Sequence, residues 1–164
     1  MVTEREITAI HEAGHCVAAE SFGFPCYRIR KAIIFPNKEE NGKTDYELLS
    51  IFTRFYRFIC VNSDEKPIFL MSGNIAQLHF YKGSRIFPGD KRELKKLLSF
   101  DKGLCSWFHN RKPIDIAKII RETKTILFTD ENLKALKEIA RVMNEKGEIS
   151  GDEIRAIIAR TRKN

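Results

Sequence analysis

The pentapeptide His11-Glu12-Ala13-Gly14-His15 constrains this chain more than any other feature of its sequence. Residues four apart on an α-helix lie one above the other on the same face, so a helical HExxH segment can offer both imidazoles to one metal ion. Glu12 follows the first His and would lie beside the metal, where its carboxylate can accept a proton from a metal-bound water. The pattern therefore predicts a zinc ion bound by His11 and His15, with Glu12 as the general base of amide hydrolysis.

The residues around the motif predict the helix that such a site needs. Thr3 and Glu6 have the T-x-x-E spacing of a capping box, which begins a helix just before the motif. Apolar and small residues then recur at helical spacing on one side of that helix: Ile7, Ile10, Gly14, Val17 and Ala18. His11 and His15 lie at the edge of this stripe and are expected to point toward the protein body. An HExxH string can arise by chance on a helix surface, and the stripe is what favours a metal site here.

Length and composition fit one globular domain spanning residues 1–164, with 43% hydrophobic and 31% charged residues. No apolar run approaches the ~20 residues that a membrane-spanning helix needs. The amino terminus leads into a charged helix without an apolar signal core, so we expect no export. The four cysteines are widely spaced and form no CxxC pair, which fits a cytoplasmic protein with reduced thiols. Cys16 would point away from the metal-binding face and is expected to pack in the core.

The net charge of +7 raises the question of a nucleic-acid surface. Basic residues cluster at Arg28–Lys31, Lys91–Lys96 and Arg155–Lys163. Acidic residues interleave with most of them and no nucleic-acid-binding motif is visible, so a solvated Lys-rich face is the favoured interpretation. Gly42-Lys43-Thr44 ends like a phosphate-binding loop, but position 37 holds Asn instead of the required Gly, and we reject that assignment.

Capping residues, prolines and glycines divide the chain into mostly helical segments. A strand is expected at Tyr27–Phe35, ended by Pro36, and a polar turn over residues 37–45. The segment Leu48–Val61 leaves helix and strand undecided. Helices are expected from the motif to Gly23, from Ser63 or Asp64 to His79, from Asp90 through Leu98, from Pro113 through Ile120, from Asp130 to Gly147 and from Ser150 through Ile158. The pattern predicts a mainly α domain with a small β-sheet or hairpin.

This order of segments resembles the peptidase domain of the FtsH-type ATP-dependent zinc proteases. In that family HEAGH precedes a strand of the form V-x-I-x-P and a Gly-x-Thr turn, to which Ile33-Ile34-Phe35-Pro36 and Gly42-Lys43-Thr44 correspond. A later Gly-Gly-Arg-Ala-Ala-Glu helix has a diverged counterpart in residues 72–77, and the C-terminal helix, turn and helix correspond to residues 144–158. The resemblance covers nearly the whole chain, and HEAGH is its specific part.

The resemblance implies a mostly helical zinc peptidase with a polypeptide substrate. Two His and one acidic side chain would bind zinc, and Glu12 would be the catalytic base. It also implies an edge strand that aligns an extended substrate through backbone hydrogen bonds. The candidates for that strand are Ala32, Ile33, Ile34 and Phe35.

The third zinc ligand that the family implies is an Asp, a few residues beyond a Gly and followed by apolar helical residues. Counted without gaps from Gly89, that position is Glu93, and the apolar residues after it keep the register. Asp90 has the expected residue type but lies three residues early. The two acids also have the spacing of a capping box, which needs no metal. Both stay candidates, with Glu93 preferred and His79 next.

Two departures from the family leave a second function open. The sequence contains no ATPase module or membrane segments of the kind that feed unfolded chains to such proteases, so a peptidase would act without ATP, or with a separate ATPase or further copies of the chain. The family's Arg and Glu are Asn74 and Gln77 here, which changes the side chains that support the ligands. These departures favour a non-proteolytic, zinc-binding or protein-interaction module, whereas the intact Glu12 favours the peptidase.

Overall fold

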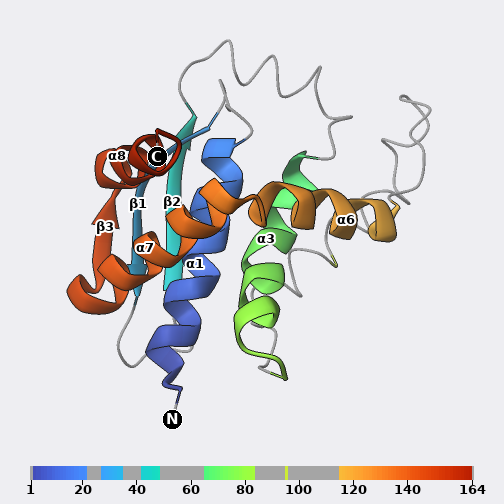
Figure 1. Cartoon of the computed structure of the whole chain (residues 1–164), viewed down its shortest axis with the longest axis horizontal. Coiled ribbons are helices and arrows are strands. Elements are labelled where there is room, and N and C mark those ends of the chain that lie inside the picture. The colour runs from blue at the N-terminus through green and yellow to red at the C-terminus, as the bar shows by residue number, and fades with distance from the viewer. Residues whose placement is uncertain are drawn as a thin grey trace.

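Helices make up most of the part of the chain that the structure describes, and a small antiparallel sheet makes up the rest of its regular structure (Figure 1). The structure is a computed structural model, and it describes residues 2–21, 27–34, 42–48, 65–83, 95 and 115–163. The expected mainly helical class with a small sheet is therefore confirmed. Within these ranges, no helix combines the length and the apolar character needed to cross a membrane.

Helix α1 (Glu4–Ser21) carries the HExxH motif through the middle of the molecule (Figure 1). Its predicted capping box is present, because the Glu6 amide donates to the Thr3 hydroxyl oxygen and the Thr3 amide donates to the Glu6 carboxylate. The hydrogen bonds that the Thr3 amide and the Thr3 hydroxyl donate to this carboxylate lower the pKa of Glu6. Every residue from 8 to 19 is buried, because α3, α7 and the sheet pack around the helix. The motif thus lies in the interior.

Strand β1 (Tyr27–Ile34) is the central strand of the sheet, whose order is β2-β1-β3. Strand β2 (Gly42–Leu48) pairs with one edge of β1 and β3 (Glu148–Ser150) with the other, both antiparallel. The strand expected at 27–35 is confirmed as far as Ile34. The turn expected over residues 37–45 is wrong from Gly42 onward, because pairing with β1 holds this polar segment extended.

The position of β1 overturns the expectation that Ala32, Ile33 and Ile34 form an edge strand for a substrate. Ala32 is paired with Thr44 of β2 and Ile149 of β3. The amide of Ile34 donates to the carbonyl of Gly147 at 2.8 Å. Since the backbone of this segment is hydrogen-bonded on both sides, an extended peptide cannot add to it. Phe35, the fourth expected residue, lies outside the described residues.

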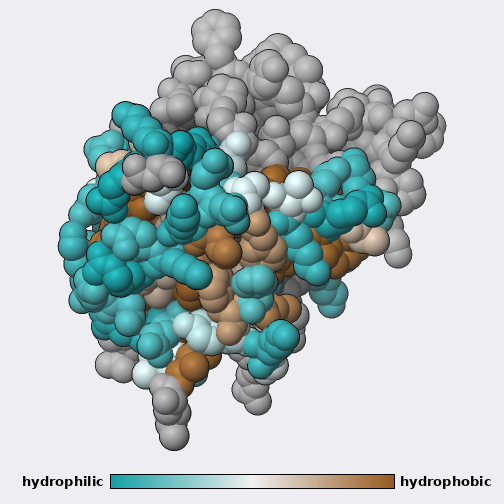
Figure 2. All heavy atoms as spheres, viewed as in Figure 1, coloured by the Kyte–Doolittle hydropathy of each residue, from teal (hydrophilic) through white to brown (hydrophobic). Residues whose placement is uncertain are grey.

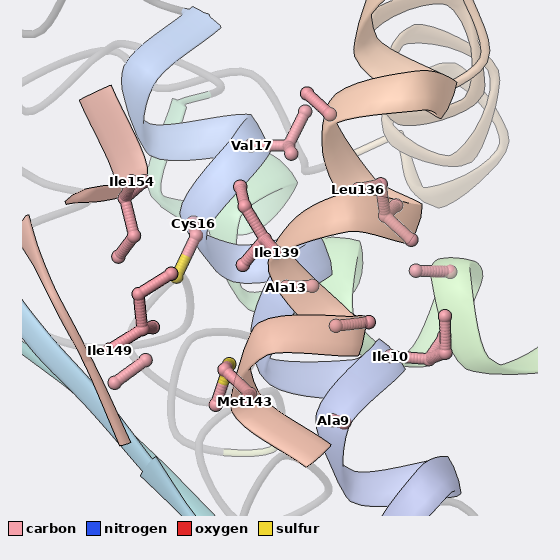
Figure 3. Close-up of a cluster of buried hydrophobic side chains, with 14 of the residues drawn as sticks. Ala9, Ile10, Ala13, Cys16, Val17, Leu136, Ile139, Met143, Ile149 and Ile154 are labelled. Carbon is pink, nitrogen blue, oxygen red and sulfur yellow. The ribbon is translucent and has the colours of Figure 1, made fainter. Parts of the chain in front are cut away.

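Helices α7 (Asp130–Lys146) and α8 (Gly151–Thr161) complete the core against α1 and the sheet (Figure 3). The N-cap of α7 is Thr129, one residue before the expected Asp130, and Gly147 ends the helix in the left-handed conformation at φ 85°. The predicted capping box of Ser150 and Glu153 begins α8. The core that these elements share includes Ala13, Cys16, Val17, Leu136, Ile139, Met143, Ile149 and Ile154. The expected core position of Cys16 is confirmed.

The start of α8 is fitted closely to β1. A Cβ at Gly151 would overlap the carbonyl oxygen of Ile29, so the close approach of helix and strand requires glycine there. Beside it, Nη1 of Arg155 lies 3.3 Å from the same carbonyl oxygen and 3.4 Å from a carboxylate oxygen of Glu20 on α1. The C-terminal helix is thus tied to both the sheet and the motif helix.

Helix α3 (Glu65–Phe80) runs alongside α1, and α6 (Ile116–Leu127) packs against α3 (Figure 1). Helix α6 begins after the N-cap Asp115, whose carboxylate accepts from the Lys118 amide. On the face in Figure 2, hydrophilic side chains cover much of α7 and α8, and apolar side chains reach the surface where α7, α3 and α6 meet. Phe80 and Phe128 are among the partly buried aromatic residues that pack against the core.

Candidate metal centre

The two histidines of the motif converge on one point. Their Nε2 atoms lie 3.2 Å apart, and the imidazole planes are inclined by 79°. Two nitrogens that each lie about 2.0–2.1 Å from a tetrahedral zinc are about 3.3 Å apart, so the spacing fits two zinc ligands. The His11 and His15 side chains are buried, with 2% and 6% of each residue exposed. Helical spacing on α1 alone brings them together, as predicted.

Helix α3 fixes the orientation of His11. Nδ1 of His11 lies 3.0 Å from the side-chain oxygen of Gln77, which is buried. Because an amide oxygen only accepts hydrogen bonds, Nδ1 must carry the proton and donate it. The Nε2 lone pair of His11 then points toward His15, as a metal ligand requires.

The backbone of α3 fixes His15 in the same way. Nδ1 of His15 donates to the carbonyl oxygen of Phe69 at 2.8 Å. The hydroxyl of Ser72 donates to that carbonyl at 2.6 Å, and its oxygen lies 3.2 Å from the same Nδ1. With both Nδ1 atoms acting as donors, two Nε2 lone pairs face each other at 3.2 Å. Two such lone pairs repel unless a cation lies against both, so the donor set fits a metal ion.

Strand β2 holds the third residue of the motif. The Thr44 hydroxyl donates to Oε2 of Glu12 at 2.7 Å. Gly42 lies against the other carboxylate oxygen, since a Cβ there would come 2.7 Å from Oε1. Residues two apart in a strand share a face, which is why both Gly42 and Thr44 reach Glu12. The Gly-x-Thr segment therefore orients the proposed base.

Cys16 is adjacent to the motif but has no ligand role in this arrangement. Burial raises the pKa of its thiol well above the usual range, and the nearby Glu12 carboxylate raises it further. Its Sγ contacts the Thr44 hydroxyl at 3.9 Å, on the core side of α1. Its buried position among core residues fits a packing role.

The two acids expected as third ligand, Asp90 and Glu93, lie outside the described residues. His79, the next candidate, is exposed on α3 and stacks on Phe128 with ring centroids 4.1 Å apart. Among the residues that the structure describes, no third His, Cys, Asp or Glu completes a metal-binding group with the two histidines.

Three residues that support the motif were not predicted from the sequence: Thr44, Phe69 and Ser72. Phe69 contributes a backbone carbonyl, which leaves no signal in a sequence. If residues 42–48 had been predicted as a strand, the alternation of side chains along it would have indicated Thr44. Gln77 was noted as a substitution, and the structure gives its contact with His11.

The chain was also compared with known proteins. No protein-family model and no curated protein matches its sequence.

Replacing Gln77 by Ala is expected to lower zinc affinity about 10–100-fold, the usual cost of removing a side chain that orients a metal ligand. The His11 ring would lose the acceptor that fixes its proton on Nδ1. Affinity would be measured by competition with a chromogenic chelator. Gln77→Glu keeps an acceptor and should bind zinc more tightly than the Ala variant, while Leu78→Ala, at an exposed position, should match the wild type. Equal affinity in Gln77→Ala and wild type would contradict the assignment.

Proposed function

We propose that the protein is a zinc-dependent peptidase. The observation that carries the proposal is the convergence of the His11 and His15 Nε2 atoms at 3.2 Å with both Nδ1 atoms engaged as donors. An HExxH sequence that arose by chance is not expected to have both imidazoles oriented toward a common point by hydrogen bonds at Nδ1.

The chemistry divides between the metal and Glu12. Zinc, when bound, supplies Lewis acidity that polarises a carbonyl and makes a water molecule acidic near neutral pH. Glu12 accepts the proton of the attacking water and passes it to the leaving amine. The Thr44 hydroxyl donates to Oε2 of Glu12 and so holds the carboxylate in place. His11 and His15 would bind the metal through Nε2, because their partners on α3 hold the Nδ1 proton of each ring.

The substrate is an extended polypeptide, and β2 is the strand proposed to align it. Strand β2 lies at an edge of the sheet, and in the described part of the chain only β1 pairs with it. Its Thr44 contacts Glu12, so a peptide added to its outer edge would run near the base. This assignment replaces the one to residues 32–35.

The alternative is a zinc-binding or protein-interaction module without hydrolysis. The observation in its favour is the burial of Glu12, which is only 5% exposed and is hydrogen-bonded to Thr44. A carboxylate held in this way can have a purely structural role. A neutral amide, Gln77, also stands where the family that the sequence resembles has a carboxylate. The intact Glu12 is the reason to prefer the peptidase.

The test combines metal analysis with a peptidase assay on an unfolded, fluorescently labelled polypeptide. We expect about one zinc per chain, hydrolysis that stops on removal of zinc by a chelator, and recovery when zinc is added back. A zinc-bound protein that cleaves no unfolded polypeptide would support the binding module. A protein that binds no zinc would refute the peptidase and the zinc-binding module, and would leave only the protein-interaction module.

A further inference from the structure

Gly73 of α3 packs against the Nε2 atoms of His11 and His15, too closely for a residue that has a Cβ. A Cβ built on Gly73 would come 2.5 Å from Nε2 of His15 and 2.6 Å from Nε2 of His11. It would also lie 2.8 Å from Cδ2 of His11. Cβ atoms in proteins essentially never approach other atoms within 3.0 Å, so any residue but glycine would have to displace both rings.

The two rings cannot move aside without losing their partners. His11 is held by Gln77 and His15 by the Phe69 carbonyl, and both partners belong to the helix that carries Gly73. A displaced ring would break a buried hydrogen bond on the same helix. A Cβ at position 73 and two oriented imidazoles therefore exclude each other.

Conformational freedom does not account for this glycine. Gly73 lies inside α3 and is absent from the positive-φ glycines of the described chain, which are Gly83 and Gly147. Glycine is a poor helix former compared with alanine, so local structure would favour alanine at this position. Glycine is required at position 73 because there is no space for a Cβ.

Gly14 lies in the same interface between α1 and α3, on the side of α1 that faces α3, and is required only by the packing of the two helices. Its Cβ would meet the Ser72 carbonyl oxygen at 2.7 Å and the Ala76 Cβ at 2.8 Å. These atoms belong to the helix–helix packing, whereas the atoms facing Gly73 are the nitrogens themselves. Gly14 thus sets the distance between α1 and α3, and Gly73 faces the site.

We propose that Gly73 is a positioning residue for the metal: its missing side chain leaves open the space beside both Nε2 atoms. The proposal rests on the zinc site of the proposed function but not on peptidase activity. It concerns how tightly the pair of histidines can hold an ion.

The first experiment measures metal binding by Gly73→Ala. We expect zinc affinity to fall at least ~10-fold, as when a ligand shell is disturbed, and the absorption bands of bound Co²⁺ to weaken or shift. Leu78→Ala, a substitution on an exposed face of the same helix, should leave both readouts unchanged. Zinc affinity and Co²⁺ spectra identical to wild type in Gly73→Ala would overturn the proposal.

The second experiment separates a local clash from general damage to the fold, and uses metal-free protein. Gly73→Ala should lower the midpoint of urea unfolding in the wild-type background. In the His11→Ala/His15→Ala background the opposing rings are gone, so the same substitution should leave the midpoint unchanged or raise it. If Gly73→Ala does not fold alone, recovery of folding in that background would support the proposal. An equal loss in both backgrounds would refute it.

The outcomes distinguish this proposal from the proposed function. A wild-type protein that binds no zinc would remove the metal site itself. Zinc binding without hydrolysis would refute the peptidase and leave the role of Gly73 intact. Zinc binding in wild type and equally in Gly73→Ala would refute only the role of Gly73.

Discussion

Glu12→Gln should lose most hydrolysis while retaining about one zinc per chain. The amide preserves the shape of the side chain and offers an oxygen to the Thr44 hydroxyl, so the packing between α1 and β2 should survive. It cannot accept a proton from water at neutral pH, and loss of a general base commonly costs about 10²–10⁴-fold in rate. Turnover and zinc content of the same preparation would be measured together.

Glu4→Gln is the matched control, because it makes the same chemical change at an exposed position in the first turn of α1. It should hydrolyse substrate at the wild-type rate. Undiminished activity in Glu12→Gln would mean that another group removes the proton. Equal losses in both variants would point to damage of the helix.

His11→Ala/His15→Ala should bind no zinc, and hydrolysis should fall to background. Both side chains direct Nε2 to one point, and no other His, Cys, Asp or Glu in the described part of the chain forms a metal-binding group with them. Zinc per chain, measured by elemental analysis after dialysis, should fall from about one to about zero.

His79→Ala serves as the control for that variant. His79 is exposed and stacked on Phe128, so its removal should leave the zinc content unchanged. Full zinc in the double variant would place the metal site elsewhere. Loss of zinc in His79→Ala would restore that histidine as a candidate ligand.

The helices could be predicted because their signals are local. The Thr3–Glu6 and Ser150–Glu153 capping boxes, and the left-handed Gly147, act within one turn of the residues that they begin or end. Each is visible in a window of a few residues, and each appears where the sequence placed it.

The sheet could be predicted only in part because its pairing is not local. Strand β2 contains Gly42, Lys43, Thr44 and Asp45, which read as a turn, and it is a strand only because β1 lies beside it. Strand β3 has three residues, too few for any periodic pattern. The expectation that residues 32–34 form an edge strand was wrong for the same reason. A central strand and an edge strand have similar sequences when both are short and apolar.

The site was predictable as far as helix geometry determines it. The spacing of His11 and His15 required that they meet, and they do. The contacts that fix their proton positions come from α3, which lies more than fifty positions later, and depend on how two helices pack. No local pattern contains that information.

The packing of α1 has a consequence for how the protein folds during translation. The apolar residues that cover the motif helix, among them Leu136, Ile139 and Met143, belong to α7, while β3 and α8 close the other side of the core (Figure 3). Helix α1 precedes these elements in the chain, so a ribosome makes it before them. Until they emerge, α1 can pack only against β1, β2, α3 and α6, which precede them in the chain. We therefore expect the core around α1 to be completed only once α7, β3 and α8 have been synthesised.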